Sequence, residues 1–186
     1  MPDLAPTPGQ TVGPFFHYGL PFPGDSELIP AAHRNAIRLH GNVFDGTGAP
    51  VPDALIEVWQ ADSKGEIVAE QGSLHRDGWT FTGWGRAATD AAGHYSLSTV
   101  TPGSTGPGQA PFFAITVFAR GLLDALFTRA YLPHGNVSGD PLLAGLAVDR
   151  RNTLMCTPET TGYRFDIHLQ GPDETVFLTY PRSPHD

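Results

Sequence analysis

Basic residues are scarce in this sequence. Lys and Arg together number 11 against 19 Asp and Glu, so the formal net charge is -8, and Lys64 is the single lysine. Proteins that hold DNA or RNA neutralise its phosphates with clusters of Lys and Arg side chains. The composition therefore argues against a nucleic-acid partner.

Cysteine and long apolar runs are also lacking. Cys156 is the one cysteine, which rules out an intrachain disulfide and agrees with a reducing compartment. No companion motif marks its thiol as catalytic, so we interpret Cys156 as a small buried side chain. No stretch reaches the roughly 18 apolar residues of a membrane helix, and the first residues lack the basic end and apolar run of an export signal. These absences predict a cytoplasmic protein.

Glycine and proline are abundant and lie between apolar runs. The 22 Gly and 18 Pro residues are placed as turns between short strands are. A chain of 186 residues, 40% of them hydrophobic, fits one globular domain. Residues 1–35 hold too many prolines for a strand ladder. We therefore predict an all-β protein with an extended N-terminal arm over 1–35 and a single domain over 36–186.

Alternation of apolar and polar residues predicts where the strands lie. The period of two that marks a half-buried strand is most regular over residues 163–169. The continuous apolar run at 112–118 indicates a central strand, although periodicity alone leaves a helix open there. A short helical pattern covers 122–125. The other predicted strands span 37–43, 54–60, 95–99 and 127–131, and residues 60–85 form a long polar excursion.

The histidines do not form a metal motif along the chain. They stand at positions 17, 33, 40, 75, 94, 134, 168 and 185, so no two are spaced i,i+2 or i,i+4. Histidines distant in sequence could still meet in the fold, but we interpret each as a surface or hydrogen-bonded side chain. A nucleophile elbow, a phosphate loop and paired zinc cysteines are absent. The residues by themselves therefore show no catalytic centre.

Three segments carry a resemblance to a known family. Residues 39–61 read L-x-G-x-V-x-D-x-x-G-x-P-V-P-x-A-x-I-x-V-W-Q-A, residues 85–95 contain G-R-A-A-T-D and G-H-Y, and residues 163–167 read Y-R-F-D-I. Together they resemble the core of the intradiol ring-cleavage dioxygenases. The start T-P-G-Q-T-V-G-P-F-F at 7–16 resembles one branch, the alpha subunits of two-chain enzymes. The resemblance implies a β-sandwich fold.

The ligand positions of that family are occupied by other residues in this chain. Family members hold Fe(III) with two tyrosines and a His-x-His pair, because hard ferric iron favours anionic phenolate oxygens. The matching positions here are Ile67, Thr105, Ala114 and Thr116, and no His-x-His occurs anywhere in the chain. The resemblance therefore implies a subunit that binds no metal, paired with a homologous beta subunit that holds the Fe(III).

The resemblance also implies a reaction and a role for this chain. The alpha-beta hetero-oligomer would cleave 3,4-dihydroxybenzoate with O2 to 3-carboxy-cis,cis-muconate in aromatic degradation, within the beta-ketoadipate pathway. Phe15 would form part of the wall of the beta subunit's pocket, and Thr11, Gly13 and Pro14 would shape the arm. Arg129 would attract the substrate carboxylate. Core packing of Phe15 and a surface or interface role for Arg129 remain open.

Two other interpretations compete with this one. The pattern Asp45-x-x-Gly48-x-Pro50-Val51 followed by Asp90-x-x-Gly93-x-Tyr95 also resembles prealbumin-like sandwiches, which are binding or structural modules. The N-terminal arm and the segment 163–167 argue against such a module, which needs neither. A self-sufficient iron dioxygenase is disfavoured by the four missing ligands.

Overall fold

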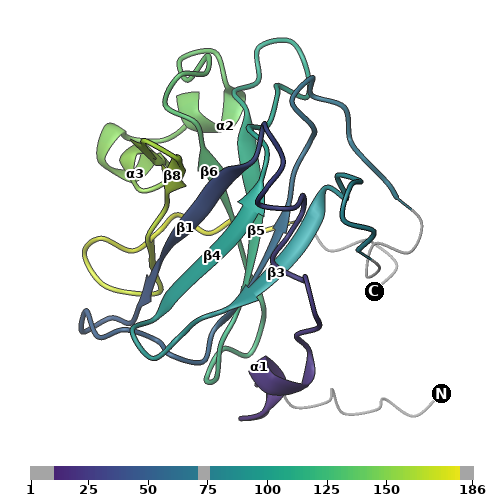
Figure 1. Cartoon of the computed structure of the whole chain (residues 1–186). Helices are drawn as coiled ribbons and strands as arrows, with labels where there is room; N and C mark the ends of the chain where they lie inside the picture. The colour runs from purple at the N-terminus through teal and green to yellow at the C-terminus, as the bar shows by residue number, and fades with distance from the viewer. Residues whose placement is uncertain (1–10, 71–75, 181–186) are drawn as a thin grey trace, which may run out of the picture.

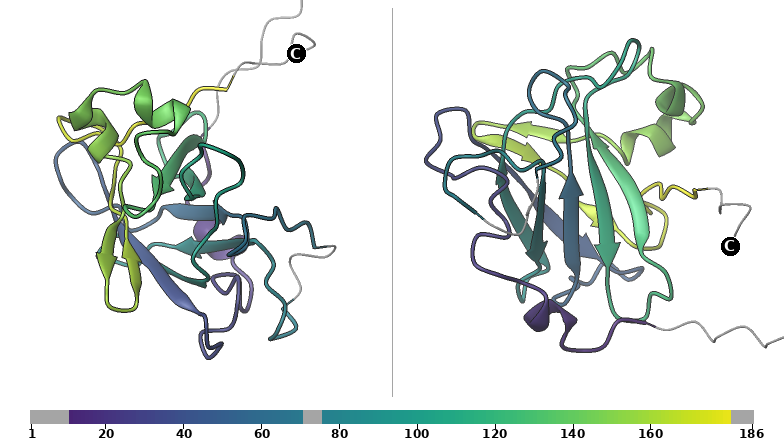
Figure 2. Two further views of the ribbon diagram at one scale, coloured as in Figure 1. Left: turned by 90° about the horizontal axis from the view of Figure 1, so that it is seen from above. Right: turned by 90° about the vertical axis from the view of Figure 1, so that its right-hand side faces the viewer.

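Two β-sheets pack face to face in the computed structural model, which describes residues 11–70 and 76–180 (Figures 1 and 2). One sheet has the order β4-β1-β8-β7, with β9 also paired to β1, and the other has the order β3-β2-β5-β6. The strands of the first are β1 (Ile37–Phe44), β4 (His94–Thr99), β7 (Thr157–Glu159), β8 (Gly162–Arg164) and β9 (Ile167–His168). Those of the second are β2 (Leu55–Trp59), β3 (Trp84–Ala88), β5 (Phe112–Phe118) and β6 (Leu126–Tyr131). The predicted all-β sandwich is confirmed.

The core lies between the two sheets. Alternate residues of β1, β4 and β5 are buried, as the period of two predicts. Leu39 and Val43 of β1 and Ile115 and Val117 of β5 belong to one buried cluster. Cys156 belongs to the same cluster and is 3% exposed, which confirms its interpretation as a buried side chain. Burial raises the pKa of its thiol, so the reactive thiolate is disfavoured.

The segment 163–169 forms two short strands rather than the single strand predicted. β8 pairs in parallel with β1 at His40↔Arg164, and β9 pairs with β1 at Val43↔Ile167. Between these pairs the backbone N–H of Asn42 donates to the carboxylate of Asp166 at 2.8 Å instead of to a backbone carbonyl. The side chain of Asp166 thus interrupts the ladder, which the alternation of apolar residues does not reveal.

Helix is confined to three short segments of the described residues: α1 (Phe16–Gly19), α2 (Pro141–Ala144) and α3 (Val148–Asn152). The helix predicted at 122–125 was wrong, because these residues lie in the non-helical connection between β5 and β6. α2 begins after Asp140, whose carboxylate accepts the backbone N–H groups of Leu142 and Leu143. No helix in the described residues is long and apolar enough to cross a membrane.

The N-terminal arm lies in part outside the described residues, which begin at Thr11. From there the chain forms α1 and then follows the sandwich, where Glu27 makes a bridge with Ser98 of β4. Leu28 is fully buried in the main core. The boundary at residue 35 stays a prediction.

Candidate functional site

The outer face of the second sheet gathers several of the residues singled out by the resemblance. In β5 the residues Phe113, Ile115 and Val117 are buried, so Ala114 and Thr116 lie on the opposite face. Ala114 pairs with Trp59 of β2 on one side and with Arg129 of β6 on the other, and Thr116 pairs with Glu57 and Phe127. We call this surface the β5 outer face; it is made of Glu57, Trp59, Ala114, Thr116, Phe127 and Arg129.

Arg129 is held by aromatic side chains rather than by a carboxylate. Its guanidinium carbon lies 4.2 Å from the ring centroid of Phe112, and Nη1 donates to the hydroxyl of Tyr131 at 3.1 Å. Burial raises the pKa of Tyr131, so the phenol is a neutral partner, and Arg129 forms no ion pair within residues 11–70 and 76–180. A guanidinium in this state can bind an anionic group with its remaining donors.

The second cation near this face is already neutralised. Arg86 of β3 forms an ion pair with Glu57 at 2.6 Å and lies over the ring of Trp84, 5.0 Å from its centroid. Its Nη1 donates to the backbone carbonyl of Leu20 at 2.9 Å. Arg86 therefore ties the segment after α1 to the sheet, and its charge is not free for a ligand.

The four positions that match the family's metal ligands do not suit a ferric ion. Ile67 is 80% exposed and carries no donor atom, and the hydroxyl of Thr105 is hydrogen-bonded to Gln109. Ala114 has no donor atom either, and Thr116 offers a neutral hydroxyl, which is a poor substitute for imidazole or phenolate. In the part of the chain that the structure describes, no group of three or more His, Cys, Asp or Glu side chains could hold a metal ion.

The arm residues lie near the end of the sandwich at which α1 sits (Figure 1). The hydroxyl of Thr11 accepts the backbone N–H of Gly121 at 2.7 Å, and the carbonyl of Gly13 accepts that of Phe16 at 3.3 Å. Phe15 is 74% exposed and precedes α1, next to the exposed Pro14. No contact joins Phe15 to Arg129 among the described residues, so their roles at one pocket stay predictions.

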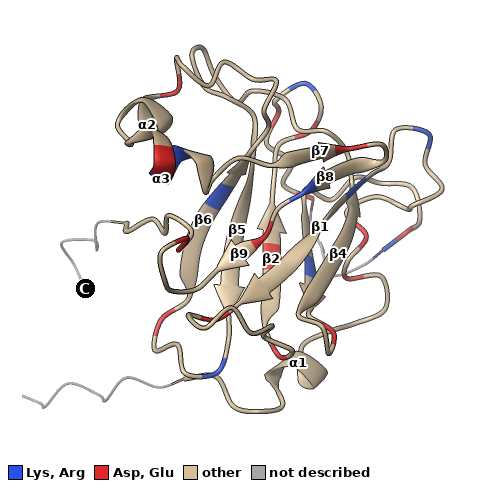
Figure 3. Ribbon diagram, turned by 90° about the vertical axis from the view of Figure 1, so that its left-hand side faces the viewer, with Lys and Arg blue, Asp and Glu red and all other residues tan. Residues whose placement is uncertain are grey.

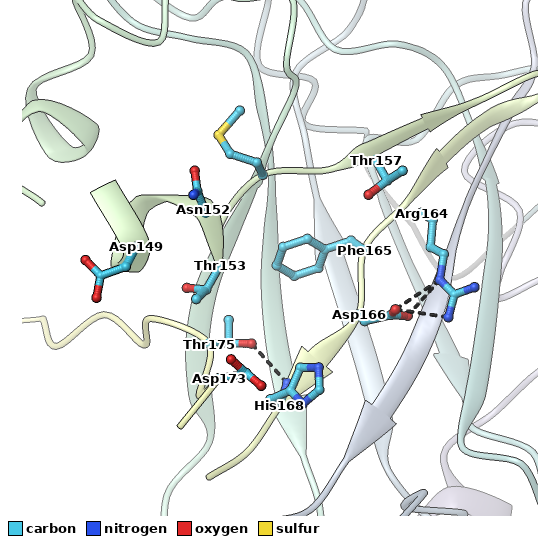
Figure 4. A pocket seen from close by; sticks show the side chains of 11 residues that line it. Asp149, Asn152, Thr153, Thr157, Arg164, Phe165, Asp166, His168, Asp173 and Thr175 are labelled. Atoms are coloured by element: carbon cyan, nitrogen blue, oxygen red, sulfur yellow. Dashed lines mark hydrogen bonds and ion pairs between the residues drawn. The ribbon is translucent and has the colours of Figure 1, made fainter. Parts of the chain in front are cut away.

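A hollow lies elsewhere on the molecule, between α3 and the strands β8 and β9. Its volume is about 360 Å³, and its side chains include Asp149, Asp173, His168 and the ion pair of Arg164 with Asp166 (Figure 4). None of the residues predicted for a site lies in it. The sequence did not predict this hollow, because its lining residues come from α3 and from the segment after it. These two parts are brought together only when β8 and β9 pair with β1.

Comparisons with known proteins agree with this geometry. A family model described as dioxygenase matches residues 30–134. The chain is 38% identical over 197 residues to the protocatechuate 3,4-dioxygenase alpha chain of Burkholderia cepacia. The alignment covers 96% of this chain and 99% of that protein. It is 35% identical to the beta chain from the same organism, over 82% of this chain and 74% of that protein.

Solved structures show the same architecture. The dioxygenase domain of a dioxygenase carbohydrate-binding protein fusion from Streptomyces sp. SirexAA-E superposes with a TM-score of 0.59 at 25% sequence identity, covering 90% of this chain and 99% of that one. The fold agrees with the match to the family model and with the near full-length similarity to an alpha chain. This chain therefore belongs to the intradiol ring-cleaving dioxygenase family.

Proposed function

We propose that this chain is the subunit of a protocatechuate 3,4-dioxygenase that binds no iron, active in an alpha-beta hetero-oligomer. The observation that carries the proposal is the β5 outer face, where Ala114 and Thr116 lie side by side with Trp59 and Glu57 at the positions to which the resemblance assigns histidines. The near full-length similarity to an alpha chain supports the same conclusion.

The proposed reaction opens 3,4-dihydroxybenzoate between its two hydroxyl groups to give 3-carboxy-cis,cis-muconate. Both atoms of O2 enter the product, so the reaction needs no external reductant. Fe(III) in the beta subunit would supply the activation of the catecholate. This chain would contribute binding and shape, through the guanidinium of Arg129 and the exposed ring of Phe15.

Two exposed aromatic side chains on the β5 outer face fit contact with a homologous partner. Trp59 is 49% exposed and Phe127 is 40% exposed, and both flank the small side chains of Ala114 and Thr116. Large aromatic side chains of this kind are enriched at protein interfaces. We propose that the beta subunit covers this face in a cytoplasmic complex.

Co-expression tests the proposal directly. We expect the chain produced alone in iron-containing medium to be colourless and inactive, because phenolate ligands to iron give such enzymes their colour. Expressed together with a homologous beta chain, the pair should be coloured and should open 3,4-dihydroxybenzoate. Stoichiometric iron and turnover in this chain alone would contradict the proposal, and so would full activity of the beta chain without it.

A further inference from the structure

Two histidines 54 residues apart in sequence meet on the outer face of the first sheet. His40 lies on β1 and His94 begins β4; the strands pair antiparallel with Asn42 opposite His94, so the two histidines are diagonal neighbours. Leu39 and Gly41 are buried, and His40 between them lies on the opposite, outer face of β1. Nδ1 of His40 lies 3.2 Å from Nε2 of His94. The face formed by β1, β4, β7 and β8 is drawn in Figure 3.

The second nitrogen of His40 has a carboxylate partner. Nε2 of His40 lies 2.9 Å from Oε2 of Glu159 on β7. A carboxylate can only accept, so Nε2 carries the proton and the lone pair of a neutral His40 sits on Nδ1, facing His94. The same carboxylate–histidine arrangement orients metal-binding imidazoles in proteins, where it sets the tautomer and raises the basicity of the ligand.

The separation of the two nitrogens matches that of two ligands on one ion. Two imidazole nitrogens bound to tetrahedral Zn²⁺ at 2.0–2.1 Å lie about 3.3 Å apart, close to the 3.2 Å found here. Both rings stand on paired strands, so little rearrangement is needed. We infer that His40 and His94 form a two-histidine site for a borderline divalent cation such as Zn²⁺, oriented by Glu159 and completed by water.

Arg38 competes with the cation for this position. Its Nη2 lies 3.4 Å from Nε2 of His94, and its Nε donates to the hydroxyl of Ser96 at 2.8 Å. The guanidinium is exposed and forms no ion pair among the described residues, so it can swing away when an ion binds. Its charge opposes a cation, and its removal should therefore strengthen binding.

The same nitrogens also suit a simple N–H···N hydrogen bond, and mutation separates the two cases. Zn²⁺ is titrated by calorimetry at neutral pH into the intact alpha-beta complex, or into the whole chain if no complex forms, so the result does not depend on the proposed function. We expect one binding event per alpha chain that disappears in His94→Gln and His40→Gln. Glu159→Gln should weaken it by about tenfold, as loss of such a partner usually does.

Two further variants complete the test. Arg38→Gln should bind Zn²⁺ more tightly than the wild type, an effect that a purely structural role of the histidines does not produce. His134→Gln, which removes an exposed histidine, should leave the binding event unchanged. Zn²⁺ should raise Tm in the wild type and not in His94→Gln, because a ligand that binds the folded state stabilises it. Equal Zn²⁺ binding by the wild type and His94→Gln would contradict the proposed site. Absence of Zn²⁺ binding even in Arg38→Gln would also contradict it, and either result would mean that the two histidines form only a hydrogen bond.

Discussion

Arg129 combines a fixed position with a guanidinium that forms no ion pair in the described part of the chain. The ring of Phe112 and the hydroxyl of Tyr131 hold the guanidinium, and neither is anionic. If it meets the substrate carboxylate in the complex, Arg129→Gln should raise KM for 3,4-dihydroxybenzoate by about tenfold, since a hydrogen bond to a charged group contributes about 1.5–3 kcal/mol.

Steady-state kinetics with two ligands checks this prediction. Binding of catechol, which lacks the carboxylate, should change little in Arg129→Gln, and Arg129→Lys should restore part of the lost affinity for the acid. A similar loss for both ligands would assign Arg129 to packing against Phe112 instead.

A buried side-chain pair links the two sheets where β2 and β4 end. Gln60 donates to the backbone carbonyls of Ala61 and Val100, at 3.1 and 2.9 Å, and accepts a hydrogen bond from the hydroxyl of Thr99. Thr99 is fully buried. Thr99→Val keeps the shape but leaves the amide oxygen of Gln60 without a donor, which should lower the free energy of unfolding by about 1–3 kcal/mol. Urea unfolding measures the change, and Thr157→Val, at an exposed threonine of β7, should have a much smaller effect.

Asp90 makes the turn before β4 sensitive to acid. Its carboxylate accepts the backbone N–H groups of His94 and Ala92, and these hydrogen bonds lower its pKa. Because the unfolded chain then takes up the proton more readily, the stabilisation is present above the ordinary pKa of 3.8 and is lost as pH falls through the lower folded value. The difference in Tm between the wild type and Asp90→Ala should shrink in acid. A Tm difference that does not change with pH would contradict this prediction. The control is Asp124→Ala, at an exposed position, and the same loss of its Tm difference in acid would also contradict the prediction.

At the scale of elements, Gly41 allows the C-terminal segment to lie against β1. A Cβ at this position would be 1.9 Å from the backbone carbonyl oxygen of Phe165, between the paired segments β8 and β9. Gly41→Ala should therefore destabilise the chain by about 3 kcal/mol or more, because backbone cannot move aside as a flexible side chain can. Denaturant unfolding tests this, with Gly19→Ala as control, since nothing lies within 4 Å of a Cβ there. Equal stability of the two variants would show that β8 and β9 are not held in this position.

Elements whose residues show a regular pattern within the segment itself could be predicted from the sequence. Elements whose bounds depend on contacts with distant segments could not. The apolar run of 112–118 became β5 with the predicted bounds. The division of 163–169 depends on Asp166 reaching Asn42, a contact 124 residues apart in sequence. α2 had a usable signal in Asp140 followed by Pro141, an N-cap residue and a proline at the first turn, which the strand-based interpretation missed.

At the scale of the whole molecule, the β5 outer face should decide assembly if the proposed complex exists. Trp59→Glu places a charge beside Ala114 and Phe127 and should weaken association with the beta chain by at least about tenfold, since a buried unpaired charge is costly. Sedimentation or gel filtration of the co-expressed pair measures this. Val148→Glu, at a 67% exposed residue of α3, serves as the control, and equal assembly of both variants would exclude this face as the interface.

Short-range pattern was sufficient to determine the all-β class and most strands, because both depend on residue identity and a period of two along the chain, whereas the four positions that match the family's metal ligands came from the resemblance. Which strands lie side by side was decided by the tertiary structure alone. Register places Arg129 next to Ala114 and His40 next to His94, and such neighbours arise from backbone pairing between segments that have no local relation in the sequence. Long-range pairing, unlike strand formation, is a property of the folded chain as a whole.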